Sequence, residues 1–230
     1  GDRVVAVSQY CDYPPAVGKL PRVGSYLQPG IEAIARLQPE LVLMQAEHKQ
    51  AVARLRAMGL KVLALRNTGL DETLHSIREI ANAAGVAARG DELERSLRSR
   101  LAAIERRTEG APRRSLLFVV GRTPGRLEGM IAVGKGSFLN ELIRIAGGRN
   151  VLADSPVAYP RISMEAVMRL DPDVIVDMGD MAETAGVTEQ HKRSVVRLWE
   201  TQAPSLRAAA RGQVHAVAAG VFVAPGPRVV

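Results

Sequence analysis

The chain has four tyrosines, and all of them lie in predicted loops next to strands or helices. They are Tyr10, Tyr13, Tyr26 and Tyr159. Tyrosine combines a rigid apolar ring with one polar hydroxyl, which suits the recognition of a large, flat, partly polar ligand. Loops that follow strands are also where α/β proteins bind their ligands. These tyrosines are therefore candidate ligand-binding residues. The alternative is that they pack against neighbouring prolines.

Residues that could carry catalysis are sparse. The four histidines lack metal-ligand spacing, and Cys11 is the single cysteine. No Gly-x-Ser-x-Gly sequence offers a nucleophile for acyl transfer. Residues 134–137, GKGS, lack the preceding glycine of a phosphate-binding loop, so Ser137 is predicted to cap a helix and Gly136 to form the turn before it. We therefore expect no enzyme, no bound metal and no intrinsic cofactor.

A pattern that occurs twice must position these loops. Residues 31–43, IEAIARLQPELVL, are matched in register by residues 164–176, MEAVMRLDPDVIV. Each copy predicts a short amphipathic helix, ended by a proline, and then a buried strand. We therefore expect two similar units, and a cleft between such units is a common binding place for small molecules.

Strands and helices alternate around both copies, which predicts an α/β fold with parallel sheets. The predicted strands cover residues 4–7, 41–44, 61–65, 116–120, 151–152, 174–176 and 214–218. The predicted helices lie around Glu32, at 50–58, from Asp71 onward, at 137–146, around Glu165 and at 195–199. Asp71 is expected to cap its helix. Both units should resemble the Rossmann fold.

One long charged helix, from Ala87 to Glu109, separates the two series. Its apolar residues form a narrow stripe, so we expect it to lie across both lobes as a rigid connection. The predicted domains are an N-terminal lobe at 1–86, a connecting helix at 87–110 and a C-terminal lobe at 111–230. The ligand cleft is expected between the lobes, and their opening and closing should be small.

The composition argues against nucleic acid as a partner. The formal net charge is +7, but the arginines are scattered over predicted helices, and aromatic residues make up only 3% of the chain. A nucleic-acid surface needs concentrated positive charge, and single strands need aromatic platforms. No apolar run approaches the roughly 18 residues of a membrane span. The arginines are therefore expected to form a solvated surface.

Five segments in both predicted lobes carry a family resemblance. They are Val7–Pro15, Leu20–Tyr26, Gly134–Leu142, Gly147–Val151 and Tyr159–Glu165, together with the first copy of the repeat. These motifs resemble cobalamin-type periplasmic binding proteins of ABC importers, a helical-backbone class that also includes siderophore and haem binders. The resemblance covers essentially the whole chain. Asp12–Pro15 is the stretch that points to cobalamin in particular.

The resemblance implies a substrate-binding protein that captures a corrinoid such as cobalamin between its lobes and delivers it to the permease of an ABC importer. It implies a periplasmic or other extracytoplasmic location, with lipid anchoring of the full-length protein left open. The implied ligand-binding residues are Tyr10, Tyr13, Tyr26, Tyr159 and Arg228. Family members also begin with a further strand and helix and end with a further helix, so both lobes are expected to be trimmed here.

The resemblance further implies that Glu32 and Glu165, one on each lobe, dock onto arginines of the permease. Two separated, exposed carboxylates can orient a rigid partner. The alternative is that each glutamate only favours the positive end of its helix dipole.

Two alternatives to the corrinoid remain open. A ferric siderophore or haem could be the ligand, and haem would need an axial residue such as Tyr10, Tyr26 or His48. A more distant alternative is an enzyme or chaperone that acts on a metal cofactor.

Overall fold

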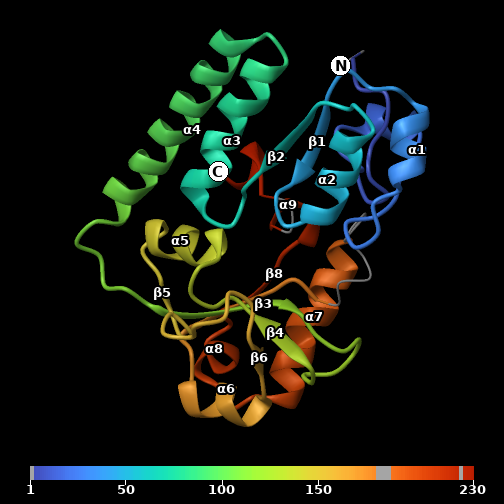
Figure 1. The fold of residues 1–230 in the computed structure, drawn as a ribbon. Coiled ribbons are helices and arrows are strands. Elements are labelled where there is room, and N and C mark those ends of the chain that lie inside the picture. Colours follow the sequence, from blue (N-terminus) through green and yellow to red (C-terminus); the bar gives the residue numbers. More distant parts are fainter. Residues whose placement is uncertain (1–2, 180–187, 223–224) are drawn as a thin grey trace. The chain divides into compact units, whose positions relative to one another are not determined.

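The computed structural model describes residues 3–179, 188–222 and 225–230. The described residues form two compact units. The first unit holds residues up to 67 together with 76–90, and the second holds 68–75 and the residues from 91 onward. Both units contain helices and strands, so the predicted α/β class is confirmed (Figure 1). The lobe boundaries at 86 and 110 stay a proposal.

The first unit is built on a short parallel pair of strands. β1 (Val42–Gln45) and β2 (Val62–Leu65) pair in parallel, and α2 (Lys49–Ala57) connects them. The other elements of this unit are η1 (Pro15–Lys19), α1 (Ile31–Arg36) and the second half of α3 (Leu70–Ala83). The apolar faces of α1 and α2 and the inward residues of both strands form one core, which comprises Ile31, Ile34, Val42, Val52, Leu55 and Val62.

The strand predicted at residues 4–7 is wrong. Only Val7 pairs, in an isolated parallel bridge with Arg22. The side chains of Val4 and Val5 are exposed. An apolar run forms a strand only where a neighbouring strand and a covering layer are available, and among the described residues the pairing here stops after one residue.

The second unit contains a six-stranded sheet. Its strands are β3 (Ser115–Gly121), β4 (Met130–Ala132), β5 (Arg149–Asn150), β6 (Arg161–Ile162), β7 (Val174–Asp177) and β8 (Val214–Ala216). The order is β6-β4-β3-β7-β8, and β5 also pairs with β3. β3, β5, β7 and β8 run parallel, whereas β4 runs antiparallel to β3 and to β6. The expectation of purely parallel sheets is therefore wrong at this edge.

Helices cover the sheet and surround a core centred on Leu117, Val119, Ile175 and Trp199. α7 (Glu189–Gln202) packs against β8, and α8 (Arg207–Ala210) packs against β7. The remaining helices of the unit are α5 (Phe138–Ile145), α6 (Met164–Leu170), α9 (Ala219–Phe222) and η2 (Pro227–Val229). No helix among the described residues is long and apolar enough to cross a membrane.

Two local predictions in this unit are wrong. The strand expected at 151–152 lies two residues earlier, at β5, because the buried Asn150 turns the chain: its Oδ1 accepts a hydrogen bond from the Leu152 N–H at 3.0 Å. Asp71 does not cap α3. Its carboxylate pairs with Arg98 at 2.7 Å, and Glu141 Oε1 accepts from the Leu70 N–H at 2.9 Å.

The long charged helix and the repeat agree with the structure. α4 spans Ala87–Thr108. In the repeat, α1 leads to β1 and α6 leads to β7, each across a proline. Residues at matched positions share their burial: Ile34 and Val167 are buried in the two helices, and Val42 and Ile175 in the two strands.

Candidate ligand-binding and docking residues

Three candidate tyrosines lie in one part of the first unit and are exposed. Tyr10, Tyr13 and Tyr26 have exposed fractions of 70%, 58% and 50%. The loops that carry Tyr10 and Tyr26 are tied together, because the Gln9 N–H donates to the Gly24 carbonyl at 2.7 Å and Arg22 donates to the Ser8 carbonyl at 2.9 Å. The fold thus holds two aromatic loops side by side and leaves their rings open to solvent.

Tyr26 has an aromatic neighbour from a different element. Its ring lies edge-on to the imidazole of His48, with centroids 4.8 Å apart and an angle of 70° between the ring planes. His48 follows the end of β1 and immediately precedes α2. The pair therefore lies beyond the carboxyl end of a parallel strand, where α/β proteins present ligand-binding groups.

Tyr159 belongs to the second unit and is half-exposed. The segment before it approaches the backbone closely at Gly134, whose N–H donates to the Ala158 carbonyl at 2.8 Å. A Cβ at Gly134 would lie 2.2 Å from the Val157 carbonyl oxygen, so only glycine fits there. Partial burial raises the pKa of the Tyr159 phenol, and a hydrogen bond with Ser137 opposes that shift. Tyr159 is therefore a neutral phenol at neutral pH.

Arg228 lies in η2, near the end of the described chain. Its Nη2 donates to the Gly220 carbonyl of α9 at 3.1 Å, and the residue is exposed. One donor of the guanidinium is thus hydrogen-bonded to the protein backbone. The role of Arg228 toward a ligand stays a prediction.

The two candidate docking glutamates are the second residues of matched helices. Glu32 in α1 and Glu165 in α6 are both exposed. Glu32 pairs with Arg54 at 2.9 Å, and both side chains are more than 60% exposed. Glu165 makes no ion pair within the described part of the chain. The Ser163 hydroxyl already caps α6, where it accepts from the Ala166 N–H at 3.2 Å, so Glu165 is not needed as the cap.

Sequence reasoning missed a buried charged cluster at the carboxyl ends of β3 and β7. Arg122 Nε donates to Asp177 Oδ2 at 2.9 Å, and both side chains are almost fully buried. The same oxygen accepts from Trp199 Nε1 at 2.7 Å, while Oδ1 accepts from the Gly179 N–H at 2.6 Å. The sequence did carry a signal, since each of the two charges stands at the end of an apolar strand.

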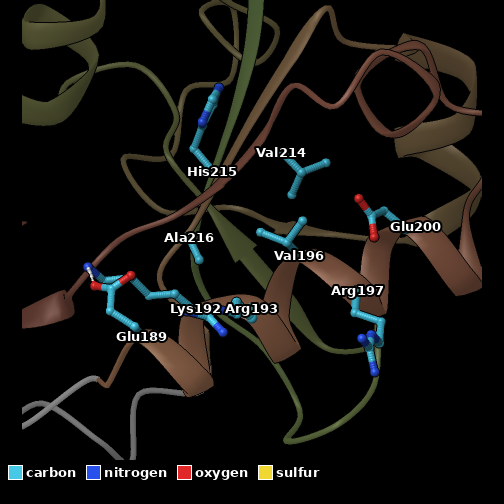
Figure 2. Close-up of a pocket in the computed structure, with 9 residues that line it drawn as sticks. All are labelled: Glu189, Lys192, Arg193, Val196, Arg197, Glu200, Val214, His215 and Ala216. Carbon is cyan, nitrogen blue, oxygen red and sulfur yellow. Dashed lines mark hydrogen bonds and ion pairs between the residues drawn. The ribbon is translucent and has the colours of Figure 1, made fainter.

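A shallow hollow of about 470 Å³ lies between α7 and β8 (Figure 2). It is lined by Glu189, Lys192, Arg193, Val196, Arg197, Glu200, Val214, His215 and Ala216. Glu189 and Lys192 already form an ion pair there at 2.7 Å. None of the predicted ligand-binding residues lines this hollow. Within the part of the chain that the structure describes, no three His, Cys, Asp or Glu side chains are grouped to hold a metal ion.

Exposed aromatic side chains on the loops of α/β units are features of a ligand-binding protein. Residues 1–216 match the model of the family described as "Periplasmic binding protein". The chain therefore belongs to the periplasmic binding protein family, as its motifs predicted. These proteins are non-enzymatic components of transport, in agreement with the expectation that the chain is not an enzyme.

Relatives with known names are similar over most of their length. A vitamin B12-binding protein of Vibrio cholerae is 28% identical over 232 residues, which cover 99% of this chain and 78% of the relative. A vitamin B12-binding protein of Salmonella choleraesuis is 26% identical over 196 residues, 84% of this chain and 71% of the relative.

Solved structures give a similar result. The periplasmic vitamin B12-binding protein of Vibrio cholerae matches with a TM-score of 0.80 and 27% identity, over 100% of this chain and 84% of that chain. A periplasmic haem-binding protein from Roseiflexus sp. RS-1 matches with a TM-score of 0.79 and 23% identity, over 100% and 86% of the two chains. At that identity the second match shows the shared fold alone.

Proposed function

We propose that this protein captures a corrinoid such as cobalamin outside the cytoplasmic membrane and delivers it to an ABC importer. The observation that carries this proposal is the 28% identity to a vitamin B12-binding protein over 99% of the chain. The structural match to a vitamin B12-binding protein at 27% identity supports it further. Cobalamin is then the transported ligand and not an intrinsic cofactor.

The proposed ligand-binding residues are Tyr10, Tyr13, Tyr26, Tyr159 and Arg228. The four tyrosines have exposed fractions between 43% and 70%, so part of each residue lies at the surface, where a ligand can reach it. Covering these rings with a flat macrocycle would remove apolar surface from water, at about 25 cal/mol per Å². The hydroxyls of Tyr10 and Tyr26 would contact polar groups at the rim of a corrinoid.

The proposed docking residues for the importer are Glu32 and Glu165. Both carboxylates are exposed at the second position of matched helices. The ion pair between Glu32 and Arg54 is exposed and therefore weak, on the order of 0.2–1 kcal/mol. An arginine of the permease could replace Arg54 at little cost. This exchange lets Glu32 serve a partner without weakening the fold.

Haem is the second candidate ligand, and one observation favours it. Tyr26 and His48 are in ring contact, and tyrosine and histidine are both axial ligands of haem iron in proteins. The fold is shared with haem-binding proteins.

The test is parallel calorimetric titration of the full-length protein with cyanocobalamin, haem and a ferric siderophore. We expect cyanocobalamin to bind with the highest affinity, and the Tyr26→Ala variant to bind it more weakly. Haem or siderophore binding together with no heat from cyanocobalamin would overturn the corrinoid assignment. Binding of the protein to the importer permease is then measured separately, with the permease in detergent or nanodiscs.

A further inference from the structure

The imidazole of His48 has no structural task in the described part of the chain. His48 is the residue before α2, but its side chain makes no capping hydrogen bond. Neither ring nitrogen bonds to a described residue, and neither is among the buried polar atoms without a partner. Both nitrogens are therefore in contact with solvent, although the residue as a whole is half-buried.

The ring contact with Tyr26 fixes the orientation of this imidazole. The two ring planes meet at 70°, with centroids 4.8 Å apart. A flat ligand that stacks parallel to the Tyr26 ring would meet the imidazole plane at a similar angle. The lone pair of an imidazole nitrogen lies in the plane of its ring. An imidazole nitrogen on the ligand side of this ring would therefore direct its lone pair toward the face of such a ligand, as an axial ligand does.

We infer that His48 donates a ring nitrogen to the cobalt of a bound corrinoid that carries an exchangeable axial ligand. This inference rests on the proposed function. In the step, the bond between Co(III) and an axial water breaks and the water leaves, while the lone pair of the neutral imidazole forms a Co–N bond. Cobalt keeps its oxidation state, and the neutral imidazole loses no proton.

The consequence is selectivity among corrinoids. Aquacobalamin has a water that His48 can replace, whereas the cyanide of cyanocobalamin is held tightly. Stacking on the tyrosines contributes equally to the affinity for both cobalamins. His48 would therefore strengthen the binding of aquacobalamin and leave that of cyanocobalamin nearly unchanged.

The experiment compares absorption spectra and calorimetric affinities of the full-length wild type, His48→Ala and His75→Ala with both cobalamins. His75 is an exposed histidine of α3 and serves as the matched control. We expect wild type and His75→Ala to shift the aquacobalamin spectrum to that of cobalamin with an imidazole in place of the axial water. We expect His48→Ala to lose the shift and at least about tenfold in aquacobalamin affinity, or about 1.4 kcal/mol. Added free imidazole should restore the shift.

The inference is overturned if wild type binds aquacobalamin with the spectrum of the free ligand, or if the shift persists in His48→Ala. Cyanocobalamin separates this failure from that of the proposed function. Binding of cyanocobalamin by wild type with no aquacobalamin shift removes the cobalt ligand alone. Binding of neither cobalamin removes the corrinoid assignment itself. Matching thermal melts of the three proteins establish that the variants are folded.

Discussion

Gln38 and Asp171 stand at matched positions of the repeat, and both adopt a left-handed backbone, with φ of 45° and 40°. Among the described residues they are the two non-glycine residues with positive φ. Each follows a short helix and precedes a proline, which disfavours a right-handed helical conformation in the residue before it. The repeat is therefore preserved in backbone conformation as well as in residue type.

Because Gln38 is in a left-handed turn, we expect a branched side chain at this position to lower the free energy of unfolding. A left-handed conformation costs ordinary residues roughly 1–2 kcal/mol, and asparagine tolerates it best among side-chain-bearing residues. Gln38→Val should lower the free energy of unfolding by about 1–2 kcal/mol, because its branched Cβ crowds the next carbonyl. Gln38→Asn should leave it unchanged or raise it slightly. Urea unfolding of both variants measures this, and equal midpoints would contradict the strained turn.

Because Arg207 is hydrogen-bonded to Asp171, we expect acid to destabilise the second unit. Hydrogen bonds from the backbone and side chain of Arg207 lower the pKa of Asp171 below 3.8, and hydrogen bonds from Ser115 lower that of Asp173. A carboxyl whose pKa is lowered on folding stabilises the protein above its ordinary pKa, and loses that effect as the pH falls through the folded value. The free energy of unfolding should therefore fall below about pH 4.

Asp171→Asn tests this prediction with little change in shape, since asparagine also accepts a left-handed conformation. The variant should show a smaller loss of stability between pH 4 and more acid conditions than the parent. The measurement is urea unfolding across a pH series. Identical pH profiles for the two proteins would exclude Asp171 as a source of the acid sensitivity.

We expect a large loss of stability when the Asp177 carboxylate is removed from its buried cluster. Asp177→Ala leaves the buried guanidinium of Arg122 and the indole N–H of Trp199 without their acceptor. Breaking a buried ion pair from one side costs about 3–5 kcal/mol. Glu128→Ala breaks an exposed pair with Arg126 and should cost less than about 1 kcal/mol. Chemical unfolding of both variants checks this, and similar losses would refute the special role of the buried pair.

We expect the Tyr26 ring to contribute measurably to the affinity for the ligand. Tyr26→Ala should weaken corrinoid binding by roughly 1–3 kcal/mol, the range for removing one aromatic anchor. Tyr26→Phe keeps the ring and should lose much less. Calorimetric titration of the full-length variants provides the numbers. Unchanged affinity in Tyr26→Ala would remove this residue from the binding site.

We expect that removing the two glutamates weakens binding to the importer while the fold stays intact. Glu32→Ala combined with Glu165→Ala should change stability by less than about 1 kcal/mol, because both carboxylates are exposed. Ligand affinity should also be unchanged, but association with the permease should fall. Arg54→Ala is the matched control, since it breaks the ion pair of Glu32 and keeps the glutamate. A double variant that melts far below the parent would show that the glutamates are structural.

The sequence predicted best those features that depend on neighbouring residues. Ser137 caps α5 as expected, where its hydroxyl accepts from the Asn140 N–H at 3.2 Å, and Gly136 adopts a φ of 84°. Both follow from local geometry. The four tyrosines are exposed, which agrees with their placement outside the core.

Features that depend on distant partners could not be predicted in this way. Val4 and Val5 have strand-like character, yet in the part of the chain that the structure describes the pairing here is a single bridge between Val7 and Arg22. The partner of Arg122 is 55 residues away in the sequence, at Asp177. Asp71 looked like a cap because a helix begins beside it, but Arg98 on another helix attracts its carboxylate.

The close backbone approach at Gly134 has a consequence for how this protein can vary. The phenol of Tyr159 is carried by a segment that rests directly on the glycine, with no room for even one methyl group. The size of residue 134 therefore limits where the Tyr159 phenol can lie. Inventories of contact residues would overlook such a position, whereas saturation mutagenesis scored for uptake would reveal it as intolerant.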